Sequence, residues 1–112
     1  MIGRVRERSA FARLEREGVR IRRPALWCTW CPDPDSNHPS VAFAIGRAYG
    51  PAVSRNRMRR QLRAIIRTID RADPIPPVLL LVGASPRAIE LTFDQLSNEL
   101  TAILGQIRSH RP

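Results

Sequence analysis

The residues best suited to chemistry in this chain are arginines, and they are concentrated in one short segment. All nineteen basic residues are Arg, and six of them fall between Arg55 and Arg67, a stretch without an acidic residue. Guanidinium groups bind phosphate oxygens through paired hydrogen bonds, so this segment is suited to a polyanion. A run of one sign costs folding stability, because like charges repel one another at helical spacing. The run therefore indicates a nucleic-acid-binding surface, with a membrane surface as the weaker alternative.

The arginine run is positioned by a helix that we predict over about residues 52–69. Its apolar side chains recur at helical spacing and form one stripe, made of Met58, Leu62, Ile65, Ile66 and Ile69. The opposite stripe holds Asn56, Arg60, Arg63 and Arg67, and the flanks and first turn hold Arg55, Arg57 and Arg59. One face of the helix is therefore expected to pack in a hydrophobic core, and the other is expected to be free to bind a polyanion. For Arg59 and Arg67, solvated charge or an ion pair with Asp70 is the open alternative.

Charge and composition limit the classes of protein to which this chain can belong. Sixteen Arg and six acids fall in residues 1–71, a net charge of +10, whereas residues 72–112 have a net charge of −1. Apolar residues make up 43% of the chain, and 112 residues suit one folded domain spanning 1–112. No apolar run reaches the roughly 18–20 residues that span a bilayer, and the N-terminus lacks a secretory signal. We therefore expect a soluble, cytoplasmic protein.

The remaining elements follow from local patterns. Ser9 can cap a short helix that Gly18 ends, and apolar residues predict strands over about 25–31, 41–46 and 78–82. The proline-rich segment 32–39 is expected to close a hairpin between the first two strands. Thr92 and Gln95 form a capping box that starts a last helix. The expected fold is α+β, a single small sheet with helices packed on it in the order α-β-β-α-β-α.

The sequence offers no catalytic or metal site of its own. Cys28 and Cys31 form a lone C-x-x-C in a predicted strand, where alternation places the two thiols on opposite faces. We interpret them as packing residues, because a zinc site takes four ligands and the two His residues lie far away in sequence. The acids are scattered, whereas a metal-dependent nuclease needs them to converge. We therefore predict no catalytic residue and no metal ligand in the protein.

The segment from Ala52 to Arg63 reads A-V-S-R-N-R-M-R-R-Q-L-R. It follows a strand that ends in G-R-x-x-G, and it closely resembles the A-V-x-R-N-R-x-[KR]-R-x-x-R string of the protein subunit of bacterial ribonuclease P. The first helix also resembles that of the family, with the pattern F-x-x-[VL]-x-x-x-G at Phe11, Leu14 and Gly18. The resemblance covers nearly the whole chain and implies a left-handed β-α-β crossover.

The resemblance also implies partners. Family members bind a large catalytic RNA, ribonuclease P RNA, which removes the 5′ leader of precursor tRNA with magnesium held by the RNA. The protein is then expected to be a monomer in a 1:1 ribonucleoprotein, without membrane or DNA partners. The residues implied to contact the catalytic RNA are Arg47, Arg55, Asn56, Arg57, Arg59, Arg60, Arg63 and Arg67.

A second surface is implied for the single-stranded leader, in a cleft between the first helix and the sheet. Its candidates are Phe11, Arg13, Trp27 and Thr29, since an aromatic ring stacks on a base while Arg follows the backbone. For Phe11 and Trp27, ordinary core packing is the alternative, and Trp30 is expected in the core. The chain departs from the family at Ala48, at Glu15, and at Gly83 or Ala84, where basic or aromatic residues are usual.

Rival functions remain. A structural RNA-binding protein of ribosomal type would share the charge and the fold. A DNA-binding helix is disfavoured, because a strand and not a helix precedes the basic helix. A membrane-surface role is the weakest, because the apolar face of that helix is needed for the core.

Overall fold

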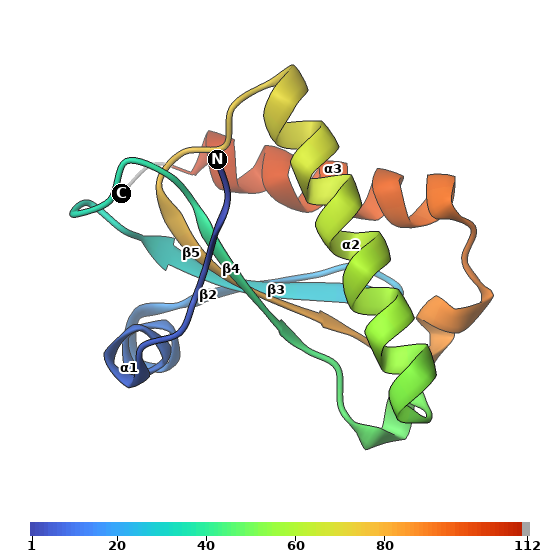
Figure 1. The fold of residues 1–112 in the computed structure, drawn as a ribbon. Helices are drawn as coiled ribbons and strands as arrows, with labels where there is room; N and C mark the ends of the chain where they lie inside the picture. The colour runs from blue at the N-terminus through green and yellow to red at the C-terminus, as the bar shows by residue number, and fades with distance from the viewer. Residues whose placement is uncertain (111–112) are drawn as a thin grey trace.

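The computed structural model describes residues 1–110, which fold into a sheet with helices on both sides (Figure 1). In chain order the elements are β1 (Gly3–Arg4), α1 (Arg8–Glu17), β2 (Val19–Arg22), β3 (Leu26–Pro32), β4 (Ser40–Ala44), the 3-10 turn η1 (Arg47–Tyr49), α2 (Ala52–Ala72), β5 (Val78–Ala84), the 3-10 turn η2 (Pro86–Glu90) and α3 (Phe93–Ser109). The three helices and three longest strands confirm the predicted α+β class. The strands β1 and β2 and the turns η1 and η2 were not predicted.

The sheet has the order β1-β4-β5-β3-β2. The predicted hairpin over segment 32–39 is wrong, because β5 lies between β3 and β4, antiparallel to the first and parallel to the second. β5 carries the continuous apolar run V-L-L-L-V, and nearly all of its side chains are buried. Such a strand is most stable at the centre of a sheet, where neighbours cover both edges and both faces. The connection β4–α2–β5 is therefore a parallel β-α-β crossover, and its left-handedness stays a prediction.

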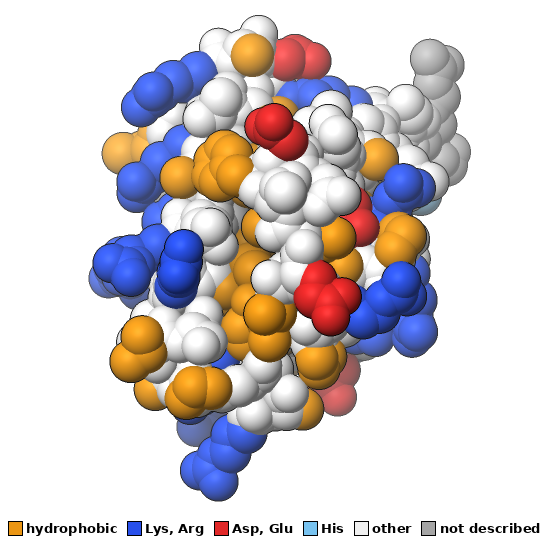
Figure 2. Space-filling model, turned by 90° about the vertical axis from the view of Figure 1, so that its right-hand side faces the viewer, with side chains coloured by type: hydrophobic (Ala, Val, Ile, Leu, Met, Phe, Trp, Pro, Cys, Tyr) orange, Lys and Arg blue, Asp and Glu red, His pale blue; other side chains and the backbone are white. Residues whose placement is uncertain are grey.

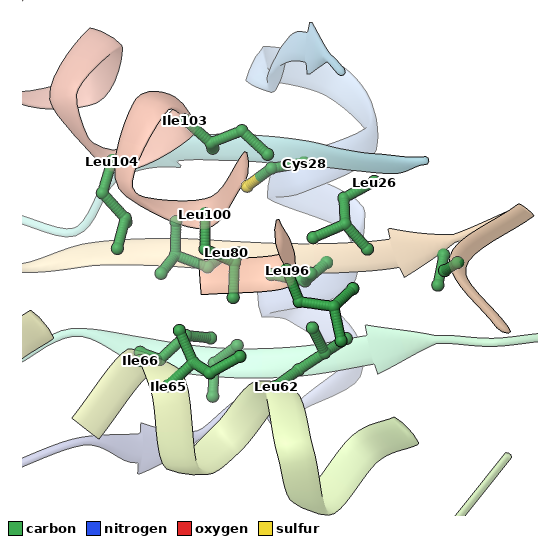
Figure 3. Packing of buried hydrophobic residues seen from close by; sticks show 14 of the residues in the cluster. Leu26, Cys28, Leu62, Ile65, Ile66, Leu80, Leu96, Leu100, Ile103 and Leu104 are labelled. Carbon is green, nitrogen blue, oxygen red and sulfur yellow. The ribbon is translucent and has the colours of Figure 1, made fainter. Parts of the chain in front are cut away.

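α2 and α3 cover one face of the sheet and form the main core with it (Figure 3). Leu62, Ile65 and Ile66 of α2 point toward Leu80 on β5, and α3 closes the other side with Leu96, Leu100, Ile103 and Leu104. Trp30 is 4% exposed in this cluster, which confirms its predicted place in the core.

α1 alone covers the opposite face, and it buries only one end of it. The second cluster consists of Val5, Leu14, Cys31 and Leu79. Cys28 belongs to the main core and Cys31 to this smaller cluster, so the two thiols do lie on opposite faces of the sheet. Both thiols are free.

The helix ends agree with the sequence in part. Thr92 Oγ1 accepts a hydrogen bond from the Gln95 backbone N–H at 3.1 Å and Gln95 Oε1 accepts one from Thr92 N–H at 2.8 Å, which confirms the capping box. Ser9 does not cap α1; the helix begins at Arg8, with Glu7 at the capping position and no side-chain cap. Gly18 ends α1 as predicted, with its N–H donating to Leu14 O at 2.9 Å.

Candidate nucleic-acid interface

α2 separates a buried face from a basic face, as its sequence predicts. Its buried side chains are Met58, Leu62, Ile65 and Ile66. On the other side, Asn56, Arg57, Arg60 and Arg67 are exposed, while Arg55, Arg59 and Arg63 are half-buried. Arg47 is exposed on η1, directly before the helix. The structure therefore gathers the predicted RNA-contacting residues on α2 and its approach; we call this set the α2 basic surface.

A tight turn fixes the start of α2. Gly50 has φ 152° and ψ −169°, a backbone conformation that is restricted almost entirely to glycine. Arg55 braces the turn, because its Nε donates to Gly50 O at 3.2 Å. The next arginine, Arg57, is left exposed beside the buried Tyr49.

Arg59 links the helix to the end of β4. Its Nη1 donates to Asn56 Oδ1 at 2.8 Å, and its Nη2 donates to Ile45 O at 3.4 Å. These contacts orient the Asn56 amide and hold the middle of the basic surface beside the carboxyl end of β4. Arg59 thus has a positioning role within the protein and remains half-buried.

Arg63 lies over an aromatic ring one turn beyond Arg59 on the same helix. Its guanidinium carbon is 5.2 Å from the centroid of the Phe43 ring on β4. Burial lowers the pKa of Arg63 from its usual value, and repulsion from Arg4 and Arg67 lowers this pKa further. Arg4, on β1, was not among the predicted residues. Its place in the surface depends on the pairing of β1 with β4, which no local pattern indicates.

The charges of the α2 arginines lack acidic partners among residues 1–110. Within residues 1–110, no arginine of α2 forms an ion pair with a carboxylate. Asp70, the alternative partner for Arg59 and Arg67, instead accepts a hydrogen bond from Ile75 N–H at 2.8 Å and pairs with the N-terminal amine at 3.6 Å. A crowded set of unpaired cations is a surface on which an anion relieves repulsion.

A cleft of about 490 Å³ lies between α1 and the sheet. It is lined by Phe11, Leu14, Glu15, Gly18, Arg20, Thr29 and Leu81. Phe11 is 38% exposed, so it belongs to the wall of the cleft and is not packed away in the core. Two of the predicted leader residues, Phe11 and Thr29, are thus brought together.

The other two predicted leader residues lie outside the cleft lining. Arg13 donates to Pro32 O at 2.8 Å and to Asp33 Oδ1 at 3.4 Å, which ties α1 to the end of β3. Trp27 lies further along β3 beneath Arg20, whose guanidinium carbon is 4.2 Å from the centroid of the Trp27 ring. The Trp27 ring covers Gly83, where a Cβ atom would overlap it.

Sequence reasoning missed Arg20 as a site residue. Arg20 lines the cleft, stacks on Trp27 and donates from Nε to Thr29 Oγ1 at 3.4 Å. The signal was present in the alternation of Val19, Arg20, Ile21 and Arg22, which is typical of a strand. Glu15, noted as a departure from the family, also lines the cleft and places a carboxylate there.

Metal ligands and thiols are the other groups in residues 1–110 that could do chemistry. That part of the chain contains no group of three His, Cys, Asp or Glu side chains able to hold a metal ion. Burial raises the pKa of the Cys28 thiol to about 12 and also raises the pKa of Cys31, so both thiols are protonated at neutral pH. None of the helices in residues 1–110 combines the length and apolar character needed to cross a membrane.

Comparisons with known proteins agree with one another. A family model described as Ribonuclease P matches residues 3–108. The ribonuclease P protein component of Micrococcus luteus is 34% identical over 120 aligned residues, covering 97% of this chain and 91% of that protein. The corresponding protein of Streptomyces avermitilis is 36% identical and covers 93% and 90%. The RNase P protein of Staphylococcus aureus has the same fold, with a TM-score of 0.81 at 21% identity over 93% of this chain and 94% of that one.

Proposed function

This chain belongs to the ribonuclease P protein family, and from that premise we propose that it binds a catalytic RNA and assists it in removing the 5′ leader of precursor tRNA. The family places the chain in tRNA processing as part of a ribonucleoprotein. The finer assignment rests on one observation, the α2 basic surface, whose arginines have no carboxylate partner within residues 1–110.

In this proposal the α2 basic surface holds the catalytic RNA. Arg57, Arg60 and Arg67 are exposed and free to donate paired hydrogen bonds to phosphate oxygens. Arg55 and Arg59 hold the turn and the Asn56 amide in place, so the surface is ordered before RNA arrives. Neutralising several phosphates makes the affinity fall steeply with salt, with a log–log slope of about −0.7 to −0.9 per contact.

The cleft between α1 and the sheet takes the single-stranded leader. Phe11 offers an exposed ring for a base, and Arg20 and Thr29 offer polar groups for the backbone. The Glu15 carboxylate in the lining repels phosphate, so leader binding here depends more on stacking than on charge. Arg13 acts indirectly, by holding α1 at its distance from β3.

Catalysis resides in the RNA subunit, which also holds the magnesium ions. The protein contributes binding and orientation, in a 1:1 ribonucleoprotein. It needs no carboxylate cluster of its own, since the metals that activate water belong to the RNA.

The test is a cleavage assay with precursor tRNA at low magnesium. The protein is added alone, with a bacterial ribonuclease P RNA, and with that RNA as Arg57→Ala/Arg60→Ala. We expect cleavage at the mature 5′ end only when the wild-type protein and RNA are combined. The double variant should weaken binding of the RNA by about a hundredfold or more, since each of the two lost charge-assisted contacts is worth about 1.5–3 kcal/mol.

The matched control is Arg16→Ala/Arg87→Ala, which removes the same charge from exposed positions outside both surfaces. It should leave stimulation unchanged. Cleavage by the protein alone would show an active site in the protein. Salt-sensitive RNA binding without stimulation would favour a structural RNA-binding protein of ribosomal type.

A further inference from the structure

A second group of arginines lies at the β2 edge of the sheet. Arg20 and Arg22 are on β2, Arg23 starts the turn into β3, and all three are exposed. Together with Trp27 and Ser85 they line a hollow of about 280 Å³. β3 and β5 lie between β2 and β4, so β2 is about 14 Å from β4 across the sheet. The hollow is therefore well separated from the α2 basic surface, which adjoins β4. In the space-filling view, basic side chains lie on both flanks, with hydrophobic and acidic side chains between them (Figure 2).

The turn that carries these arginines is held firmly. Arg23 N–H donates to Leu26 O at 2.8 Å, and Ser85 Oγ donates to Ala25 O at 3.2 Å. Glu99 Oε1 accepts hydrogen bonds from the backbone N–H groups of Ala25 and Leu26, at 3.2 Å and 2.9 Å. The carboxylate packed against the turn is therefore engaged by the backbone. Within residues 1–110, neither Arg20, Arg22 nor Arg23 has a carboxylate partner.

This hollow adjoins the cleft and shares one lining residue with it. Arg20 lines both, and its guanidinium covers the Trp27 ring at their boundary. The strand register pairs Arg20 with Thr29 and Arg22 with Trp27, so both arginines point to the same face of the sheet as the cleft. Gly83 allows the Trp27 ring to lie flat on β5 between the two sites. A strand leaving the cleft at Thr29 thus meets the Arg20–Trp27 stack first and then Arg22 and Arg23.

We propose that Arg20, Arg22, Arg23 and Trp27 form an outer leader site, which binds the nucleotides of the 5′ leader that extend beyond the cleft. Guanidinium groups suit the phosphates of a single strand, and a Trp–Arg stack offers a flat surface for a base. The site rests on the proposed function, because it requires the leader to occupy the cleft. It predicts that the protein distinguishes long leaders from short ones.

The experiment measures binding of the holoenzyme to precursor tRNAs whose leaders lengthen stepwise from one that only fills the cleft. With wild-type protein, we expect the affinity for precursor tRNA to increase a second time once the leader is long enough to extend beyond the cleft. Arg22→Ala/Arg23→Ala should lose this second gain, about a hundredfold or more for two charge-assisted contacts, and should bind short leaders normally. For long leaders, the log–log salt slope should also become shallower by about 1.4.

Arg16→Ala/Arg87→Ala again controls for total charge, and Arg22→Lys/Arg23→Lys should recover part of the gain because it restores the charge without the planar donors. Equal losses for short and long leaders would overturn the outer leader site and assign the arginines to the catalytic RNA or the tRNA body. An unchanged length dependence would also overturn it. If wild-type protein assists the RNA at short leaders, either result leaves the proposed function intact, whereas failure at every length removes both.

Discussion

The two faces of the sheet are covered very differently, and the contrast is sharpest at two neighbouring residues of β5. Leu80 faces α2 and α3 and is 1% exposed, whereas Leu81 faces α1 and is half-buried in the wall of the cleft. Two long helices cover the first face and bury most of its side chains. The ten-residue α1 covers only the Cys31 end of the second face.

The difference shows how this small protein obtains a binding site. The short helix α1 is tied to the end of β3 by Arg13 and leaves the rest of this face open. The exposed strand surface becomes the floor of the cleft. Because the open face buries less apolar surface, most of the free energy of folding must come from the main core on the other face. The predictions below test whether stability and binding are divided between the faces in this way.

The largest effect is expected from comparing Leu80→Ala with Leu81→Ala. Leu80→Ala creates a cavity in the main core and should lower the free energy of unfolding by about 2–5 kcal/mol. Leu81→Ala removes a half-buried side chain and should cost only about 1 kcal/mol. Urea unfolding of both variants measures the two losses. Equal losses would mean that the cleft face is closed in solution, and the contrast between the faces would fail.

A second comparison uses the two cysteines, which place the same side chain on opposite faces. Each is 1% exposed, and burial raises the pKa of both thiols, to about 12 for Cys28. A thiol reagent therefore reacts only when the protein opens. Cys31 belongs to a cluster of four buried residues that opens when α1 detaches, whereas Cys28 requires the main core to open.

Cys31 should therefore be labelled first, by a factor of about ten or more, which corresponds to about 1.4 kcal/mol between the two openings. Mass spectrometry after timed alkylation at mildly alkaline pH gives both rates. Cys28→Ala and Cys31→Ala identify the site of each modification. Labelling of both thiols at the same rate would show that α1 and the main core open as one unit.

The sequence predicts which side chains face the main core only where a local pattern within one helix or strand decides it. α2 was predicted because its apolar and basic stripes repeat at helical spacing. The opposite placement of Cys28 and Cys31 followed from strand alternation alone. Both patterns are properties of single elements, and neighbouring elements do not alter them.

The cleft could not be predicted in full, because it depends on which strands pair. Segment 32–39 is rich in the Pro, Asp, Asn and Ser residues that favour turns, yet β5 takes the place between β3 and β4. That choice reflects the burial of the whole V-L-L-L-V run, a free energy shared by the entire sheet. Arg20 was missed for the same reason, since its position over Trp27 requires β2 to pair with β3.

The smallest expected effect concerns the cost of the α2 basic surface itself. Arg60 is exposed, with Arg57 and Arg63 one turn away on either side and no carboxylate partner within residues 1–110. Like charges at this spacing destabilise a helix by about 0.2–0.5 kcal/mol per pair, so Arg60→Gln should raise the free energy of unfolding by about 0.5 kcal/mol. Arg16→Gln should do the opposite on α1, because Arg16 lies 3.4 Å from the Glu17 carboxylate.

Thermal unfolding at low salt measures both changes, and about 1 M salt should abolish them, because screening shortens the reach of exposed charges to about 3 Å. The same Arg60→Gln protein should bind the catalytic RNA more weakly, so that stability and affinity move in opposite directions. If Arg60→Gln lowered both the stability and the RNA affinity, Arg60 would be a residue that stabilises the fold. If Arg60→Gln raised the free energy of unfolding without weakening RNA binding, the proposal that the α2 basic surface binds RNA through Arg60 would be contradicted.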